Sequence, residues 1–260
     1  MKPTRKPIIL CFSGHDPSGG AGVQADIEVL THFNCHPCSV MTCLTVQNSS
    51  TVHRLIPLSA DDLIEQSSVL FNDMSISVIK IGLTGSAECV KAIAKVLQQH
   101  PKVPVIFDPV LAGGDGTALA DNDLIASITQ RLLPLVTVLT PNTPEARALT
   151  GLDEQSSVEA LGNALLSLGV NYVLITGGHE KGSTIKNTLF HKQRLIEQTE
   201  FKRITGGFHG TGCTLVTAIA AHIALGEPIP SAIQHAQSYT EQAIRNAEQI
   251  GQGQLFPKRT

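Results

Sequence analysis

The chain has no tryptophan, only two tyrosines and no large excess of either charge, since 19 Lys and Arg face 22 Asp and Glu in 260 residues. Without a basic excess, the usual electrostatic footprint of nucleic-acid or anionic-membrane binding is missing. The longest nearly uncharged apolar stretch, residues 215–225, is far shorter than the roughly 20 residues of a bilayer span. The basic segment of residues 2–6 precedes only a brief apolar run with no small-residue cleavage site. We therefore expect a cytoplasmic protein with no nucleic-acid or membrane partner.

The six cysteines do not form a recognisable framework, and a chain of this length does not need disulfides for stability. Cys35 and Cys38 have the spacing of half a zinc site, but no second CxxC or HxxxH pair completes it. We therefore expect buried thiols at these two positions rather than a metal or redox centre.

Short apolar runs alternate with helical patterns along most of the chain. Strands are expected at residues 8–12, 39–46, 77–81, 103–107, 136–139 and 172–175, with a hairpin over 188–191 and 194–197. Helices are expected at residues 20–32, 61–71 (capped by Asp61 and Asp62), 87–99, 123–133, 158–168, 211–225 and 229–250. Strands joined by helices of this length predict one doubly wound, mostly parallel α/β sheet in a single domain, residues 1–260.

Unusual residues follow several of the expected strands. They are Gly14-His15-Asp16, Gln47-Asn48, Gly82, Asp108, Asn142 and Gly177-Gly178. Because an open α/β sheet binds its ligands outside the carboxyl ends of its strands, this placement predicts a site at that edge. The prediction does not depend on any named motif.

The most distinctive motif is HGTGCT, residues 209–214, directly before an apolar helix. Its glycines allow a tight turn, and the helix start adds unpaired N–H groups and a partial positive charge, which favour a bound phosphate oxygen. The same field is expected to lower the pKa of the Cys213 thiol. The alternative is a glycine-rich N-cap whose thiol packs on the sheet.

Two familiar nucleotide motifs are missing. There is no G-x-x-x-x-G-K-[ST], and the glycines from Gly14 to Gly22 do not have the G-x-G-x-x-G spacing. We interpret that segment as the backbone lining of a small-ligand site. Three histidines in glycine-rich loops, His15, His179 and His209, are candidates for that site, and the others are expected on surfaces or helix faces.

Asn142 and Glu145 stand three residues apart at the start of an expected helix and allow two interpretations. A capping box is the common explanation of this spacing. Alternatively, Glu145 and Asp108 hold a hydrated Mg²⁺ beside nucleotide phosphates, since magnesium keeps most of its waters and needs few protein carboxylates. The sequence leaves both open.

Seven ordered blocks together carry a family resemblance. They are GHDPSGGAGVQAD (14–26), TVQN (45–48), IKIG (79–82), FDPV (107–110), TPNTPEA (140–146), GGH (177–179) and HGTGCT (209–214). This set resembles the ribokinase-like superfamily, and within it the hydroxymethylpyrimidine/phosphomethylpyrimidine kinases of thiamine biosynthesis, over roughly residues 8–224. The resemblance implies a three-layer ribokinase-like α/β fold, a homodimer, and ATP and Mg²⁺ as cofactors.

The implied reaction is ATP-dependent phosphorylation of 4-amino-5-hydroxymethyl-2-methylpyrimidine and then of its monophosphate. By resemblance, Cys213 accepts the substrate hydroxyl proton, while N–H groups of Gly210, Thr211 and Gly212 bind the transferring oxygens. Gln47 would pair its amide with the aminopyrimidine edge. The other implied substrate-site residues are Gly14, Asp16, Gly22, Asp26 and Gly82. The implied ATP-site residues are Asp108, Asn142, Thr176, Gly178, His179 and His209, with Glu145 and Asp108 as metal ligands.

The chain departs from the family pattern at two places. Thr176 stands where many members carry a lysine, and residues 111–115 lack the basic residue common in that loop. Fewer cations beside the phosphates predict weaker charge neutralisation, unless backbone donors and Mg²⁺ compensate. Two alternatives therefore stay open: a vitamin B6 kinase acting on pyridoxal or pyridoxine, since related kinases share the cysteine loop, and a non-catalytic pyrimidine-binding homologue.

Overall fold

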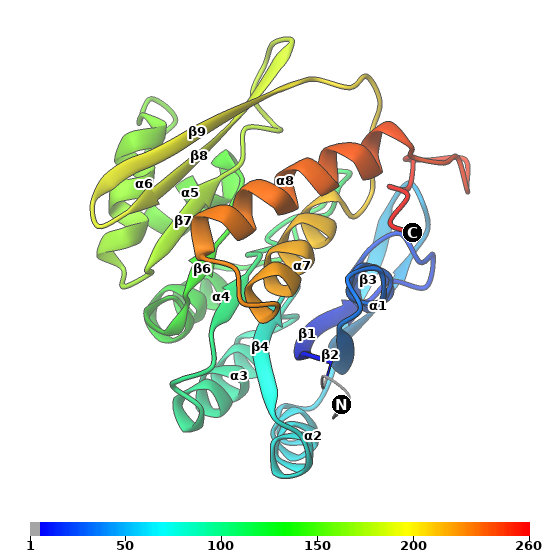
Figure 1. Cartoon of the computed structure of the whole chain (residues 1–260), viewed down its shortest axis with the longest axis vertical. Coiled ribbons are helices and arrows are strands. Elements are labelled where there is room, and N and C mark those ends of the chain that lie inside the picture. The colour runs from blue at the N-terminus through cyan, green and yellow to red at the C-terminus, as the bar shows by residue number, and fades with distance from the viewer. Residues whose placement is uncertain (1–5) are drawn as a thin grey trace, which may run out of the picture.

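The structure is a computed structural model that describes residues 6–260 and is built on a nine-stranded sheet with the order β3-β2-β1-β4-β5-β6-β7-β8-β9 (Figure 1). The strands are β1 (Ile8–His15), β2 (His36–Gln47), β3 (Val52–Pro57), β4 (Ile76–Ile81), β5 (Val105–Phe107), β6 (Val138–Leu139), β7 (Tyr172–Ile175), β8 (Thr184–His191) and β9 (Arg194–Lys202). The six strands from β2 to β7 in this order are parallel, and the pairs β2-β3, β7-β8 and β8-β9 are antiparallel. The predicted mostly parallel α/β fold is confirmed.

Within residues 6–260, eight α-helices connect and cover these strands. They are α1 (Gly22–His32), α2 (Ala60–Asp73), α3 (Ala87–Gln99), α4 (Asn122–Ser127), α5 (Thr143–Thr150), α6 (Val158–Ser167), α7 (Thr211–Ala224) and α8 (Ile229–Arg245). Among the described residues, no helix is long and apolar enough to cross a membrane.

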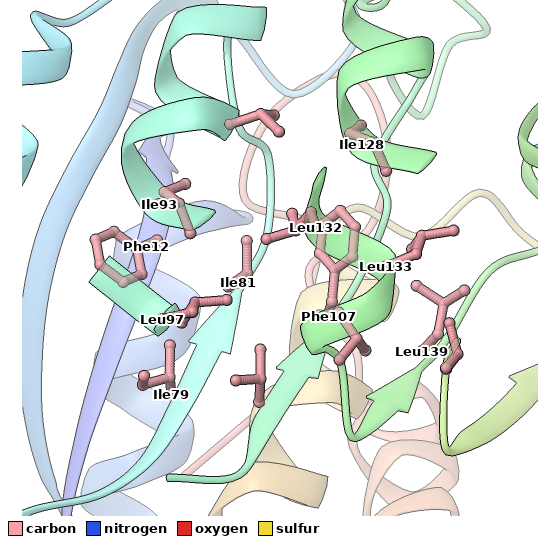
Figure 2. Close-up of a cluster of buried hydrophobic side chains, with 14 of the residues drawn as sticks. Phe12, Ile79, Ile81, Ile93, Leu97, Phe107, Ile128, Leu132, Leu133 and Leu139 are labelled. Atoms are coloured by element: carbon pink, nitrogen blue, oxygen red, sulfur yellow. The ribbon is translucent and has the colours of Figure 1, made fainter. Parts of the chain in front are cut away.

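Helices pack on both faces of the sheet, which gives three layers. Alternate residues of β1 face opposite sides, so Leu10 and Phe12 join a core with α2 to α6, while Ile9 and Cys11 join a second core with α1, α7 and α8. Figure 2 shows the first core, where side chains of β4, β5 and β6 meet those of α3. In Figure 1, α7 and α8 lie side by side over the opposite face. Burial on both faces explains the nearly continuous apolar runs of the central strands.

The helix expected at residues 123–133 is shorter than predicted. The α-helix ends at Ser127 and continues as a π-helical turn (Ile128–Leu132) and a 3₁₀ turn (Leu133–Leu135). The Thr129 hydroxyl donates to the carbonyls of Ile125 and Ala126 and so competes with the backbone N–H groups for them. Pro134 lacks an N–H group and prevents the α-helix from continuing.

Two other predictions need correction, and one strand was not predicted. Ser59 caps α2, because its hydroxyl accepts the N–H of Asp62; Asp61 and Asp62 lie in the first turn, where the helix dipole favours acidic side chains. The last helix ends at Arg245 rather than residue 250, because the chain turns back and Glu248 pairs with Phe256. The edge strand β3 was not predicted, since most of its side chains are exposed and give no apolar alternation.

The paired cysteines of the half zinc-site motif lie in the interior, as expected. Cys35 and Cys38 are both buried free thiols, the first just before β2 and the second within it. Their sulfur atoms face the Phe33 carbonyl and the Met74 sulfur respectively, which are ordinary packing partners.

Candidate functional site

A cavity of about 530 Å³ lies at the carboxyl ends of the parallel strands, where the sequence predicted a site. Most of the predicted site residues line it: Gly14, Asp16, Gly22, Gln47, Asp108, Asn142, Glu145, Thr176, Gly178, His179, His209, Gly210, Thr211, Gly212 and Cys213. Asp26 and Gly82 do not line the wall. Residues 209–213, here called the cysteine loop, and Gln47 therefore line the same cavity.

The loop before α7 needs glycine at two positions for different reasons. Gly210 adopts φ +78°, a left-handed conformation that favours glycine, and a Cβ there would collide with the Gly20 carbonyl. Gly212 allows a close approach, since a Cβ there would lie 2.8 Å from Asp108 Oδ2. The N–H groups of this first helical turn have no intrahelical partners, so the turn is suited to bind phosphate oxygens beside Asp108.

The expectation that the helix start lowers the pKa of Cys213 is wrong. Desolvation raises that pKa above its ordinary value and the Lys80 ammonium lowers it, while the carboxylates of Asp26 and Asp108 raise it further. Desolvation depends on tertiary surroundings that local sequence does not show. The thiol, which is half-buried and lines the cavity, therefore holds its proton in the ligand-free protein at neutral pH.

Lys80 is a site residue that the sequence analysis missed. It lines the cavity from β4, yet its side chain is fully buried, with Nζ 2.8 Å from Asp26 Oδ1 and 2.9 Å from Ser13 Oγ. The other Asp26 partners include the Thr217 hydroxyl, which donates to Oδ1 at 2.6 Å. Burial alone would lower the pKa of Lys80, but Asp26 raises it above its ordinary value, so the lysine stays charged.

The two predicted residues outside the wall both adjoin Lys80. Asp26 forms the ion pair, and a Cβ at Gly82 would lie 2.8 Å from Lys80 Nζ. They support the cavity floor rather than form its surface. The only sequence signal for this arrangement was a single lysine inside the apolar run of β4.

Asp16 forms a polar junction between the β1 loop and the cysteine loop. Its Oδ2 lies 2.7 Å from His209 Nε2, and its Oδ1 accepts the N–H and hydroxyl of Ser18 at 2.8 and 2.7 Å. Burial raises the pKa of Asp16, but hydrogen bonds from His209, Ser18 and Gln47 outweigh it and hold the pKa at about 2. The resulting carboxylate orients His209 and the half-exposed Gln47 amide on neighbouring parts of the wall.

Both interpretations of Asn142 and Glu145 are compatible with the geometry. The capping box is present: the Glu145 N–H donates to Asn142 Oδ1 and the Asn142 N–H to Glu145 Oε2, each at 2.9 Å. Glu145 Oε1 has only the Leu111 N–H at 3.5 Å. The capping box therefore uses Oε2 and leaves Oε1 of Glu145 with one long hydrogen bond, so that this oxygen is available to a ligand.

Asp108 and Glu145 carry the charge that a cation would neutralise. Burial, reinforced by the Asp26 carboxylate and opposed by Lys80, raises the pKa of Asp108 to about 6. Burial and the Asp108 carboxylate raise the pKa of Glu145 to about 8. Two buried carboxylates that disfavour each other's ionisation, with oxygen atoms on a cavity wall, fit the ligand chemistry of Mg²⁺.

Arg203, which the sequence analysis also missed, fixes the loop that follows β7. Its guanidinium donates to the carbonyls of Gly178, Gly182 and Glu180, at 2.7, 2.8 and 2.5 Å. Lys202 and Arg203 both line the cavity, as Thr176 does. The cavity wall therefore includes cations, which come from β9 and the loop after it.

Comparisons with known proteins find relatives along nearly the whole chain. The family model described as phosphomethylpyrimidine kinase matches residues 16–257. A hydroxymethylpyrimidine/phosphomethylpyrimidine kinase of Rhizobium meliloti is 36% identical over 95% of this chain and 94% of its own length. A thiamine biosynthesis bifunctional protein of Geobacter sulfurreducens is 34% identical over 96% of this chain, which spans only 52% of that protein.

Solved structures resemble the whole fold. A Bacillus subtilis pyridoxal kinase in complex with ADP has a TM-score of 0.88 and 27% identity, covering 98% of each chain. A phosphomethylpyrimidine kinase of Clostridium difficile has a TM-score of 0.81 and 30% identity, covering 92% of this chain and 100% of that one. Fold similarity extends to kinases of both substrate types.

Proposed function

The chain belongs to the phosphomethylpyrimidine kinase family, and from that premise we propose that it phosphorylates 4-amino-5-hydroxymethyl-2-methylpyrimidine and then its monophosphate, with ATP as donor, in thiamine diphosphate biosynthesis. The observation that carries the proposal is the common cavity of Gln47 and the loop 210–213. Its volume of about 530 Å³ falls within the roughly 300–1,000 Å³ of small-molecule sites.

The pyrimidine binds at the end of the cavity formed by the β1 loop and β2. The Gln47 amide offers one donor and one acceptor to the aminopyrimidine edge. Its hydrogen bond to the Asp16 carboxylate orients it. Leu83 and Val52 supply apolar wall for the ring and its methyl group. This places the hydroxymethyl group toward Cys213.

In the transfer step, the substrate hydroxyl oxygen forms a bond to the γ-phosphorus of ATP, and the bond from that phosphorus to the β,γ-bridging oxygen breaks. The Cys213 thiol first releases its own proton to the solvent that reaches this partly exposed side chain, and the thiolate sulfur then accepts the hydroxyl proton. The Lys80 ammonium favours that thiolate and opposes the desolvation that raises the pKa of Cys213. N–H groups of residues 210–212 stabilise the transferring oxygens, and one such donor is worth about 2.7–4 kcal/mol in comparable oxyanion sites.

The ATP phosphates lie between the start of α7 and the wall formed by Asn142, Thr176 and Gly178. Asp108 and Glu145 would hold Mg²⁺, which neutralises phosphate charge when bound. Arg203 fixes the loop after β7, and His179 and His209 complete the polar surface. Phosphoryl transfer depends mainly on positioning and charge neutralisation, so these residues suffice without a Walker A lysine.

A homodimer and a cytoplasmic location are part of the proposal. Met41, Val46 and Ile56 expose apolar surface on β2 and β3, at the edge of the sheet that a second copy could cover. Light scattering of the protein as it elutes from a size-exclusion column tests the dimer. A measured mass equal to one chain would contradict it.

Vitamin B6 kinase is the second candidate, because the Bacillus subtilis pyridoxal kinase covers the chain as fully as any relative described above. Initial rates with the hydroxymethylpyrimidine and with pyridoxal, each at saturating Mg-ATP, separate the two. We expect the larger kcat/KM for the pyrimidine. A larger value for pyridoxal would overturn the assignment, and calorimetric binding of the pyrimidine without product would favour the non-catalytic homologue.

A further inference from the structure

A second group of ligand-type side chains lies at the end of α7 opposite to the cysteine loop. His222 is in the last turns of α7, Glu227 in the connection to α8, and His235 on α8. Their ligand atoms all lie within 4.8 Å of one another, and no other group of three His, Cys, Asp or Glu side chains within residues 6–260 does the same. None of the three lines the kinase cavity.

The end of α7 explains why Glu227 lies over His222. Gly226 is in the left-handed region at φ +94°, its N–H bonds the Ile223 carbonyl, and the Glu227 N–H bonds the His222 carbonyl at 3.1 Å. This is the Schellman arrangement, in which the two residues in the positions of Glu227 and His222 usually make a hydrophobic contact. Here they are a carboxylate and an imidazole, so ordinary helix termination does not account for the pair.

The two histidines direct the same ring nitrogen at one carboxylate. His222 Nδ1 lies 2.8 Å from Glu227 Oε1, and His235 Nδ1 lies 2.7 Å from Oε2. The two imidazole rings are 5.4 Å apart at an angle of 51°. Ligand atoms from three segments of the chain therefore lie within 4.8 Å of one another, with both imidazoles on the same carboxylate.

The ligand set indicates which cation fits. Two imidazoles and one carboxylate, with a fourth position left to water, are typical of Zn²⁺, whereas Mg²⁺ and Ca²⁺ take oxygen ligands. Bond lengths of about 2.0–2.2 Å in a tetrahedron separate neighbouring ligand atoms by about 3.3 Å. The histidine bonded to the ligating carboxylate oxygen must therefore open its contact by about half an ångström, while the other ligand-atom distances, now at most 4.8 Å, must come to about the same value.

The exposure of the side chains permits these changes in the distances between ligand atoms. The His235 side chain is 58% exposed and the Glu227 side chain 30%, so both can adjust and solvent can reach the site. The His222 side chain is only 12% exposed and packs edge-on against Phe33, with ring centroids 4.7 Å apart. The His222 imidazole is thus fixed, and the side chains of Glu227 and His235 can move toward it.

We propose that His222, Glu227 and His235 bind one Zn²⁺ ion at the junction of α7 and α8. The ion joins two helices that otherwise meet through side-chain packing. Because it binds the folded chain, it stabilises α7, whose other end carries the Gly210–Cys213 turn. This site is separate from the kinase reaction and does not depend on the proposed substrate.

Zinc titration of tag-free protein by isothermal calorimetry tests the site. His235→Gln removes an exposed ligand, and His53→Gln, at an exposed position of β3, is the matched control. We expect one Zn²⁺ per chain at this site in the wild type and in His53→Gln. In His235→Gln we expect binding at least about tenfold weaker, since even outer-shell changes cost 10–100-fold. The zinc-dependent rise in Tm should disappear with it.

Cys213 is a second accessible zinc ligand and must be separated from this site. The experiment is repeated in Cys213→Ala, where we expect the His235-dependent binding to persist. Glu227→Gln provides a second ligand variant, and anomalous diffraction at the zinc edge locates the ion. Equal binding by the wild type, His235→Gln and Glu227→Gln would overturn the proposal, as would zinc bound only at the Cys213 thiol.

Discussion

Lys80 Nζ lies 2.8 Å from Asp26 Oδ1, and neither side chain has any solvent exposure. The pair sits under the cavity floor, where the lysine lowers and the aspartate raises the pKa of Cys213. Further hydrogen bonds from Ser13 and Thr217 satisfy the carboxylate oxygens. The relationship links the stability of the sheet centre to the chemistry of the site, and its removal has a measurable cost.

Lys80→Met should destabilise the protein strongly, because it leaves the Asp26 charge buried without its partner. Breaking one partner of a buried ion pair typically costs about 3–5 kcal/mol. In Lys80→Met/Asp26→Asn the buried charge is gone and the amide can still bond Ser13 and Thr217, so we expect much of the stability to return. Urea unfolding measures both, with Lys91→Met as an exposed control. The single variant Asp26→Asn completes the set. If the double variant lost as much unfolding free energy as the two single variants lose together, the pair would not be coupled.

Asp16 should make a contribution to stability that is lost in acid. Its folded-state pKa of about 2 lies below the ordinary value of 3.8, so the contribution is fully present above pH 3.8 and is lost as the pH falls through about 2. A shift of this size corresponds to about 2 kcal/mol. We expect Asp16→Asn to be less stable than the wild type at pH 6, and the difference to shrink toward pH 2. Urea unfolding across that range measures it, and Asp73→Asn controls for the loss of one charge; a difference that does not change with pH would rule out the linkage.

Gly212→Ala should impair transfer without unfolding the protein. The new methyl group would lie 2.8 Å from Asp108 Oδ2, and the backbone is not in the left-handed region, so the side chain of Asp108 must move instead. Misplacement of this order costs up to about 100-fold in rate. Gly207→Ala is the control, since a Cβ there meets only Gln254 at 3.5 Å. Steady-state kinetics that do not distinguish the two variants would show that the close approach has no role.

Arg203→Gln should raise the KM for ATP more than it lowers kcat. The change removes the guanidinium that holds the carbonyls of Gly178, Glu180 and Gly182, so the loop after β7 loses its fixed position. We expect a KM increase of about tenfold, the equivalent of roughly 1.4 kcal/mol. Arg203→Lys should recover only part of it, because an ammonium lacks the planar fork that reaches three carbonyls. An unchanged KM for ATP would remove Arg203 from the nucleotide side of the cavity.

Local patterns were enough to predict the layout of the sheet. Apolar runs such as that of β1, each followed by an amphipathic helix, follow directly from strands buried on both faces. The carboxyl-end residues Gln47 and Asp108 were predicted to meet because parallel strands end at one edge of a sheet. The edge strand β3 was missed because its exposed side chains carry no such pattern.

Features that depend on long-range neighbours were not predictable. Lys80 and Asp26 are 54 residues apart, and the Arg259 side chain, 239 residues from Gly20, bonds the Gly20 carbonyl behind the cysteine loop. The pKa of Cys213 shows the same limit, because a helix start is visible in the sequence whereas desolvation by the surrounding chain is not. The Zn²⁺ ligands combine a helix end with a residue from the next helix, and two isolated histidines gave no signal.

The most direct test of the kinase account is the mass of the products formed from the hydroxymethylpyrimidine and Mg-ATP by the wild type and by Cys213→Ala. The wild type should yield the monophosphate and then the diphosphate. In Cys213→Ala, with circular dichroism and pyrimidine binding unchanged, both products should form at least about 100-fold more slowly, the usual contribution of a positioned proton acceptor. Undiminished phosphorylation by Cys213→Ala would contradict the account.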